Sequence, residues 1–540
     1  MAQISKETKS LIAKYQLWQK LQSSKEAPTI HVDEVAQKVA AFYERIRTIV
    51  DWKEEHLMRR AAVIRKLKRR FLDLELNNFS ASPLAESLVL ELIRGGYFQN
   101  DKIEESKIIT VQKIIDKYVF ILKHNPKNSN QSTSTGLQFY DRVIEIASCE
   151  IEETLAPSIK EMALIDYMFE LMIERIKISE KIYERNLLKP EDKNIQIYIA
   201  VQQALFKLDE PIISYNLIRY KFEQWNNPTE EELFKISQNI IGIISDIEKD
   251  LAHPLAKKFY RICEKYDTAY LLIGDILSTN NFEKIQQEIQ EPALLEGHIR
   301  GAYIKRLNNL KEKIRRAAIY STLSIFITKI LSIIVFEYIL TLLFQLDFKV
   351  TTLIINILIP TGLMAVLVLS IRPPSKRNIN LVVVEIMKIF YEKEKSDTYE
   401  IKIAKQKGFV TTSFLALTYI LGACISFGAI IWVFIYLQLD VPSIFINIIF
   451  IALILFAGTL VQKSAQELTI EETSGGFIMF LSDILFLPIT GMGSWMSNKW
   501  KRYNIVIAFI NALIDMPFAV FVEFLERWRY FIKEHKDDMR

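Results

Sequence analysis

Two stretches of the chain are alike: "LFQLDFKVTTLIIN" (343–356) and "YLQLDVPSIFIN" (436–447). Each lies between two long apolar runs, contains Gln-Leu-Asp, and places an asparagine early in the second run, at Asn356 and Asn447. A helix that crosses the ~30 Å hydrocarbon core of a bilayer needs about 20 mostly apolar residues. We therefore interpret each stretch as the tight turn and return helix of a membrane-spanning hairpin.

Four apolar segments are long enough for such spans, at roughly 318–344, 350–371, 409–437 and 443–461. None of them alternates as a barrel strand does, so helices are expected inside a bilayer. Because both hairpins run in the same direction, a true duplication is a parallel repeat about an axis along the membrane normal. Chance similarity is the alternative, since leucine, isoleucine and asparagine are abundant here. The hairpins are expected in either case.

Basic residues flank the four segments on one side. They stand before the first segment, after the second, before the third and after the fourth, whereas the two turns carry a single lysine, Lys349. Lysine and arginine collect on the cytoplasmic side of membrane proteins. We therefore expect a multi-pass protein of the cell membrane with its N- and C-termini in the cytosol. The first residues also lack the apolar core of a signal peptide.

The predicted fold is all-α, with a large helical cytosolic N-terminal domain, a membrane domain of two hairpins with four transmembrane helices, and C-terminal interfacial amphipathic helices. The expected boundaries are 1–316 for the cytosolic domain with a flexible loop at 124–136, 317–371 for the first hairpin, 372–408 for a cytosolic segment, 409–461 for the second hairpin, and 462–540 for helices at the cytosolic face.

Apolar periodicity predicts most of the helices in the cytosolic domain. They are expected at 31–76, 103–122, 157–186, 191–207, 229–249, 253–278 and 291–316. The last of them is expected to run directly into the first membrane segment. The cytosolic segment between the hairpins is predicted to hold one amphipathic helix and a short strand-like piece, "TYEIKI" (398–403).

Two ionisable residues, Lys329 and Glu337, fall inside the first membrane segment. Such residues are rare in hydrocarbon and are functional candidates by default, together here with Asn356 and Asn447. Eight residues of helix turn by about 800°, so the two charges point about 80° apart and pair poorly with each other. A polar path for transport is one interpretation of these charges. The structural alternative is that Lys329 extends toward the interface and Glu337 bonds to a neighbouring helix.

The C-terminal part is expected to lie at the membrane surface. Residues 477–489 are too few to cross, and Pro488, Gly491 and Gly493 are expected to break a helix there, so this segment is expected to be interfacial or re-entrant. Residues 504–525 are long enough to span, but their polar side chains, including Asp515 and Glu526, align on one stripe. A helix along the inner interface is therefore expected, with a fifth span as the alternative. Its acidic stripe is expected to meet protein.

A basic cluster, "RRAAVIRKLKRR" (59–70), stands out in the N-terminal domain. Arg59, Arg65, Lys66, Arg69 and Arg70 lie around an apolar helix face, which is typical of the solvated side of a buried helix. The candidate interaction is with anionic headgroups or with Asp515 and Glu526 of the C-terminal helix. Nucleic acid is not favoured, because no recognition motif or aromatic platform stands beside the cluster.

Motifs for catalysis and cofactors are absent from the sequence. It has no phosphate-binding glycine loop, no dinucleotide fingerprint and no His-Glu-x-x-His. Asp250 and His253 have the spacing of two ligands on one helix face, which is common by chance. Three distant cysteines do not suggest a disulfide scaffold. We therefore expect no cofactor and no metal, and no enzymatic activity.

The function expected from these features is a non-catalytic interaction platform or scaffold at the cytoplasmic face of the membrane. Its partners are the lipid bilayer and either other proteins or further copies of the same chain. The alternative is a transporter or channel component that uses Lys329, Glu337, Asn356 and Asn447. Four spans are few for a pathway, so that alternative requires an oligomer. A membrane enzyme ranks third.

Overall fold

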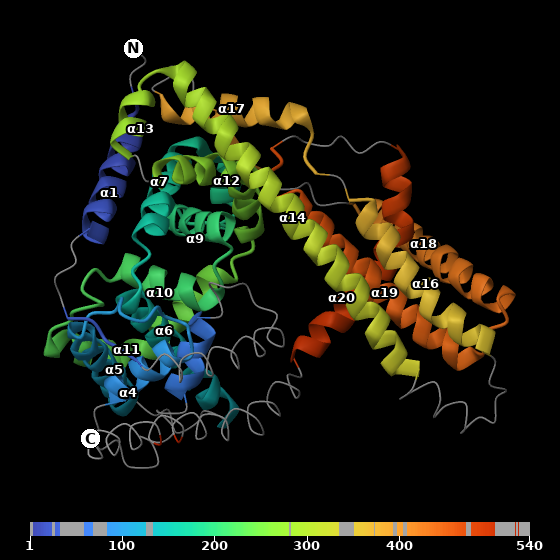
Figure 1. The fold of residues 1–540 in the computed structure, drawn as a ribbon, viewed down its shortest axis with the longest axis horizontal. Helices are drawn as coiled ribbons and strands as arrows, with labels where there is room; N and C mark the ends of the chain where they lie inside the picture. Colours follow the sequence, from blue (N-terminus) through green and yellow to red (C-terminus); the bar gives the residue numbers. More distant parts are fainter. Residues whose placement is uncertain are drawn as a thin grey trace, which may run out of the picture. The chain divides into compact units, whose positions relative to one another are not determined.

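The structure is a computed structural model, and it describes residues 4–23, 28–32, 59–68, 84–125, 133–279, 282–333, 350–371, 373–391, 397–402, 408–470, 477–502, 524 and 528. Within these residues the chain is mostly helical, with two strands of three residues each, which confirms the all-α prediction (Figure 1). The described residues fall into two compact units. The helical unit comprises 6–267 and 397–401, and the hairpin unit comprises 4–5, 268–391 and 402–502.

The helical unit is built from α-helices that bury one apolar face each. Fully buried side chains such as Leu88, Val111, Ile144 and Met168 form its core. A local signal sets one helix start: Thr229 and Glu232 form a reciprocal capping box at the N-terminus of α11 (Glu230–Leu251). Its helices are α1 (Lys6–Ser23), α4 (Leu84–Arg94), α5 (Ser106–His124), α6 (Thr133–Leu155), α7 (Ile159–Arg175), α8 (Glu180–Glu184), α9 (Asp192–Phe206), α10 (Glu210–Lys221), α11 (Glu230–Leu251) and the first half of α12 (Ala256–Leu277).

The helix predicted over 157–186 is wrong, because a strand interrupts it. Helix α7 ends at Arg175, and β1 (Ile176–Ile178) pairs in parallel with β2 (Tyr399–Ile401). The strand predicted in "TYEIKI" is thereby confirmed. Ile176 is 0% exposed and Ile401 is 2% exposed, so burial of both β-branched side chains accompanies the pairing. Tertiary pairing here outweighs local helix periodicity.

The loop predicted over 124–136 is shorter than expected. Helix α5 continues to His124, and α6 already begins at Thr133. Residues 126–132 lie outside the described residues. The run of serine and threonine that suggested a loop therefore includes the first turn of a helix, because serine and threonine also favour helix N-termini.

The hairpin unit consists of long helices. They are α13 (Phe282–Glu288), α14 (Pro292–Ser332), α16 (Val350–Leu369), α17 (Lys376–Phe390), α18 (Phe409–Tyr436), α19 (Val441–Ala465) and α20 (Phe477–Arg502), together with the second half of α12. Helix α14 is continuous over 41 residues, which confirms that the helix before the first apolar segment runs on into it (Figure 1). Pro292 stands in its first turn, where a missing N–H costs nothing.

Two helices are long and apolar enough to cross a membrane, counted among the described residues only. They are Thr411–Tyr436 of α18 and Val441–Ala465 of α19. The apolar part of α16, Ile354–Leu369, is shorter. Residues 334–349, with the first Gln-Leu-Asp turn, lie outside the described residues. The four transmembrane helices and the cytosolic termini therefore remain predictions, whereas the second hairpin meets the length and composition of two spans.

Helix α20 is continuous, so the break predicted at Pro488, Gly491 and Gly493 is wrong. Pro488 has no N–H, which leaves the carbonyl of Ile484 without its helical donor. Helix α18 comes close at this point: a Cβ on Gly422 would stand 2.6 Å from the Ile484 carbonyl oxygen. The Ser426 hydroxyl donates to the next carbonyl, that of Leu485, at 2.6 Å. Helices α18 and α20 are therefore in close contact at the turn that contains Pro488.

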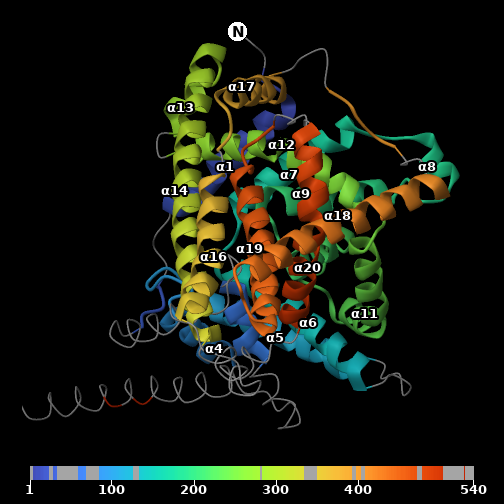
Figure 2. The same ribbon diagram turned by 90° about the vertical axis from the view of Figure 1, so that its right-hand side faces the viewer.

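Helix α20 also lies against α19. A Cβ on Gly493 would stand 2.1 Å from the carbonyl oxygen of Ala452, so only glycine fits there. Small residues that let two helix backbones approach are typical of helix packing inside membranes. Figure 2 shows α18 crossing obliquely beside α19 and α20. The three helices therefore form a close-packed group. The predicted surface helix at 504–525 lies outside the described residues.

Candidate functional site

The two asparagines of the repeated stretches contact each other. Asn447 on α19 donates from Nδ2 to Oδ1 of Asn356 on α16 at 2.8 Å, and also to the backbone carbonyl of Ser443 at 2.9 Å. Asn447 is 0% exposed and Asn356 is 1% exposed. A pair of polar groups buried between apolar helices is favoured because each relieves the other's desolvation. The pair therefore holds α16 against α19.

Lys329 on α14 is fully buried beside the same face of α19. Its Nζ lies 4.9 Å from the centroid of the Phe450 ring, which is within range of a cation–π interaction. Phe450 follows Asn447 by three residues, so both lie on one side of α19. The structure thus brings Lys329, Asn356 and Asn447 to neighbouring positions along α19. Glu337 lies outside the described residues.

The described part of the basic cluster is helical and contacts acidic and aromatic residues of its own unit. Arg59 pairs with Glu152 at 3.2 Å, and Lys66 pairs with Glu91 at 2.8 Å. Arg65 donates to the hydroxyl of Tyr97, at 3.1 Å. These three residues of the predicted interaction face are therefore engaged within the helical unit.

The cluster also contains a buried charge. Arg60 is 1% exposed and pairs with Asp209. Val63 and Leu67, on the apolar face of the same helix, are fully buried. The other members of the predicted face, Arg69, Arg70, Asp515 and Glu526, lie outside the described residues, so contact between this helix and the C-terminal stripe remains a prediction.

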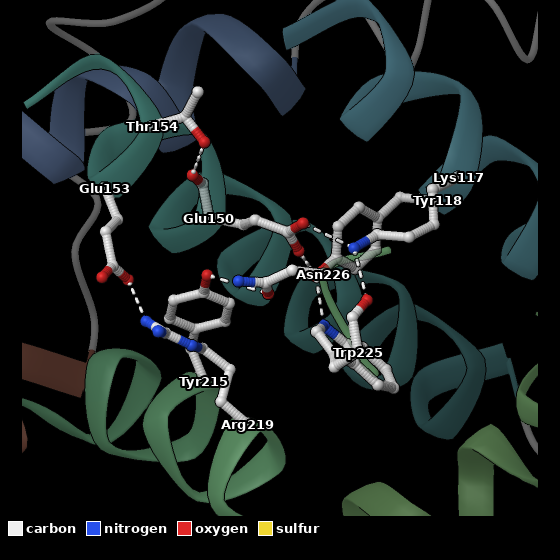
Figure 3. Close-up of polar contacts among 9 residues, drawn as sticks. All are labelled: Lys117, Tyr118, Glu150, Glu153, Thr154, Tyr215, Arg219, Trp225 and Asn226. Carbon is white, nitrogen blue, oxygen red and sulfur yellow. Dashed lines mark hydrogen bonds and ion pairs between the residues drawn. The ribbon is translucent and has the colours of Figure 1, made fainter. Parts of the chain in front are cut away.

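A buried polar network that the sequence analysis did not identify joins α5, α6 and Trp225, which follows α10 (Figure 3). Lys117 on α5 donates to Glu150 on α6 at 2.5 Å and to the carbonyl of Trp225 at 3.0 Å. Tyr118 donates to the other Glu150 oxygen at 2.7 Å, and the Trp225 indole donates to the Tyr118 oxygen at 3.1 Å. Each polar group of this network therefore has a partner.

Burial governs the protonation of this network. Desolvation lowers the pKa of Lys117, although Glu150 opposes the shift. Desolvation also raises the pKa of Glu150, against the charge and hydrogen bond of Lys117. Both directions mean that the ionised pair is costly to bury, so each charge depends on the other.

The helical spacing contained a signal for the network. Ile114, Lys117, Tyr118 and Ile121 follow the i, i+3, i+4, i+7 pattern of one helix face, and all four are buried. A lysine on an otherwise apolar face is a candidate for a buried ion pair. Its partner on another helix could not be identified from the sequence.

A groove lies next to the network, and we call it the aromatic groove. Its volume is about 570 Å³. Tyr198 and Tyr220 stack in its wall with ring centroids 5.1 Å apart, and Arg219 pairs with Glu153 at 2.6 Å. Tyr215 donates to Asn226, a lining residue, at 3.3 Å (Figure 3). Helix α6 thus carries Glu150 of the network and Glu153 of the groove, which places the network directly behind the groove.

The groove offers contacts for a ligand of mixed character. Its charged lining residues are Lys14, Glu153, Asp166, Arg219 and Glu223. Tyrosine faces and a guanidinium in one concave surface are the residue types enriched at protein interfaces. The geometry therefore suits a segment of protein better than a small substrate to be transformed.

The pair Asp250 and His253 has structural partners. Lys221 contacts the Asp250 carboxylate at 2.6 Å, and the N–H of Leu255 donates to Nδ1 of His253 at 3.2 Å. Within the described part of the chain, no group of three or more His, Cys, Asp or Glu side chains could hold a metal ion.

Comparison of the chain with protein-family models, with curated proteins and with solved structures gave no match in any of the three. The functional argument therefore depends on the geometry described above.

Proposed function

We propose that the protein is a multi-pass membrane protein whose helical unit serves as an interaction platform at the cytoplasmic face. The observation that carries this proposal is the exposed apolar surface of α18. Phe414, Leu415 and Ile420 point at least 100° apart around the helix, and they are 66%, 45% and 57% exposed. Soluble proteins rarely expose apolar side chains in so many directions along one long helix, whereas lipid favours such exposure.

The polar contacts of the hairpin unit support an anchoring role. Asn356 with Asn447, and Lys329 with Phe450, hold neighbouring helices together. A transporter or channel component is the alternative, and it requires these groups to face a hydrated path. Their complete burial against protein favours the anchor, since a permeating ion needs solvent-accessible ligands.

The aromatic groove is the binding surface in this proposal. A segment of a partner protein, or of another copy of the chain, packs an apolar side chain against the stacked tyrosines and hydrogen-bonds Arg219 or Glu153. The buried Lys117–Glu150 network behind the groove keeps α5 and α6 in fixed register, which preserves the shape of the groove.

Site-specific photo-crosslinking in native membranes tests the proposal. A photoreactive phenylalanine replaces Tyr220, which lines the groove and is 44% exposed, and the matched control replaces Phe234 on α11, which is 50% exposed and outside the groove. We expect a discrete crosslinked protein from position 220 that Arg219→Ala abolishes. Equal products from both positions, or none from position 220, would contradict a groove-specific partner.

A further inference from the structure

A second cavity, of about 840 Å³, lies within the hairpin unit. The end of α12, α13 and the middle of α14 surround it, and residues 467–468, just after α19, line it as well. Its charged and amide lining groups are mostly cationic or neutral: Lys305, Arg306, Asn309 and Lys313 from α14, with Asp275 and Glu467 as the acids.

Three of these side chains lie along one face of α14. Lys305, Asn309 and Lys313 are spaced four residues apart, so they follow one side of the helix over about 12 Å. Both lysines are exposed, and within the described part of the chain neither has an ion-pair partner. Two ammonium groups and an amide therefore remain available to a ligand in the cavity.

The third cation is held in place by an acid. Arg306 donates two hydrogen bonds to Asp275, one of them from Nη2 to Oδ1 at 2.9 Å. This bidentate pair fixes the guanidinium at the cavity wall and offsets the Asp275 charge. Glu467 is the second acid in the lining, and Lys305 and Lys313 have no ion-pair partner among the described residues, so the charged lining groups have a net positive charge.

The floor of the cavity is bare helix backbone. Gly297 and Gly301 line it, and no atom lies within 4 Å of the position that a Cβ would take on either residue. The open space above two glycines one turn apart lets a ligand approach the helix closely. A flat ring or a compact headgroup fits there, while the lysines reach its charged substituents.

We propose that this cavity binds a phosphate-bearing anion at the cytoplasmic edge of the bilayer. Free ammonium groups and an amide donor match the acceptor oxygens and the charge of a phosphate ester. Lys313 stands five residues before Ala318, where the apolar part of α14 begins, which is about 7.5 Å along the helix. A phosphorylated lipid headgroup or a free phosphate ester supplies the same chemistry. The lipid source rests on the proposed membrane topology, and the binding chemistry does not.

Binding to the full chain in detergent tests the proposal. The two probes are a short-chain phosphatidylinositol phosphate and a soluble inositol phosphate, each titrated by microscale thermophoresis. We expect Lys305→Gln with Lys313→Gln to weaken binding at least tenfold. Lys311→Gln removes the same charge from an exposed position of α14 outside the cavity and should change the Kd less than twofold. Gly301→Leu fills the cavity without changing its charge and should also abolish binding.

The two probes separate the sources of the phosphate. Binding of the lipid alone assigns a headgroup, binding of the soluble compound alone assigns a free phosphate ester, and binding of both confirms the shared chemistry. No binding of either probe overturns the proposal. Equal loss in Lys311→Gln and in the double variant also overturns it, because general attraction to a basic helix would then explain the affinity. Crosslinking at the aromatic groove is independent of all these outcomes.

Discussion

Asn447 donates its side-chain amide to Asn356, 91 residues earlier in the chain, and the two side chains are completely buried between α16 and α19. Each asparagine stands early in the return helix of one of the two similar stretches, 11 residues after Gln345 and 9 residues after Gln438. The two return helices therefore meet at the asparagine of each stretch. Whether or not the stretches arose by duplication, their asparagines form one interhelical contact.

Removal of this contact should loosen the hairpin unit. We expect Asn447→Leu to lower the free energy of unfolding in detergent by about 0.5–1.7 kcal/mol, the range for interhelical hydrogen bonds in membrane proteins. Asn356→Leu should cost a similar amount, and the double variant should cost less than the sum. The control is Thr418→Val, because that exposed hydroxyl bonds only the carbonyl of Phe414 in its own helix. Strictly additive losses would show that the two asparagines do not interact.

Close packing of α20 predicts a sharp difference among glycines. Gly493→Ala places a Cβ against the Ala452 carbonyl and Gly422→Ala places one against the Ile484 carbonyl, so each should destabilise by about 1–3 kcal/mol. Gly428→Ala is the matched control, because nothing lies within 4 Å of its Cβ position. Alanine favours the helix more than glycine does, so this change should leave the stability unchanged or raise it. Thermal unfolding of the purified variants measures the effect. Equal behaviour of all three glycines would refute the close approach of the helices.

The Lys117–Glu150 pair should behave as a buried ion pair. Lys117→Met alone should destabilise the protein by about 3–5 kcal/mol, because it leaves the Glu150 carboxylate buried without a counter-ion, with only the Tyr118 hydroxyl bonded to it. Lys117→Met with Glu150→Leu should recover most of that loss, since it removes both charges. Chemical denaturation of the single and double variants gives the comparison. If the double variant is as unstable as the single one, lost packing and not an unpaired charge causes the loss of stability.

The same pair predicts a pH dependence. The pKa of Glu150 is raised by burial above its ordinary value of 4.5, so the folded chain holds that proton more tightly than the unfolded chain. The contribution of Glu150 to the free energy of unfolding is therefore full below pH 4.5 and is lost as the pH rises through the folded-state pKa. Lys117→Met removes the charge that opposes the shift. The loss in free energy of unfolding relative to wild type should therefore be smaller at about pH 5, where Glu150 can be protonated, than at about pH 7.5. A deficit independent of pH would contradict this linkage.

Cysteine labelling can test the membrane topology. Cys149 and Cys263 are buried, and burial raises the pKa of both thiols, so neither should react in the folded protein. In a Cys424→Ser background, Gln438→Cys and Gln466→Cys place exposed thiols beyond opposite ends of α19. An impermeant maleimide applied to intact cells should label position 438 alone, and permeabilisation should add position 466. Labelling of both positions in intact cells would exclude the proposed orientation.

Local patterns predicted the elements whose stability is local. Apolar periodicity gave α5, α9 and α11 close to their observed ends, and the strand-like "TYEIKI" is a strand. The length of the apolar runs identified α18 and α19 as possible spans. The continuity of α14 through the onset of its apolar part was also predictable, because no proline or capping residue interrupts it.

Features that depend on distant partners could not be predicted. Helix α7 ends at Arg175 because β2 supplies a partner more than 200 residues later. Pro488 lies inside a helix, at the turn that Gly422 and Ser426 of another helix contact. The aromatic groove and the basic cavity collect residues from several helices, and no spacing in the sequence joins them. Arg60 could be placed on a helix, but Asp209 could not be identified as its partner.

The parallel pairing of β1 with β2 constrains the order in which the chain can fold during its synthesis. Residues 176–178 leave the ribosome long before residues 399–401, and helix α16 and its apolar segment are made in between. Strand β1 therefore has an unpaired edge until β2 has been synthesised. The helical unit is thus completed only after α14, α16 and α17 of the hairpin unit have been made, and a chain truncated before residue 397 would lack the β1–β2 pairing.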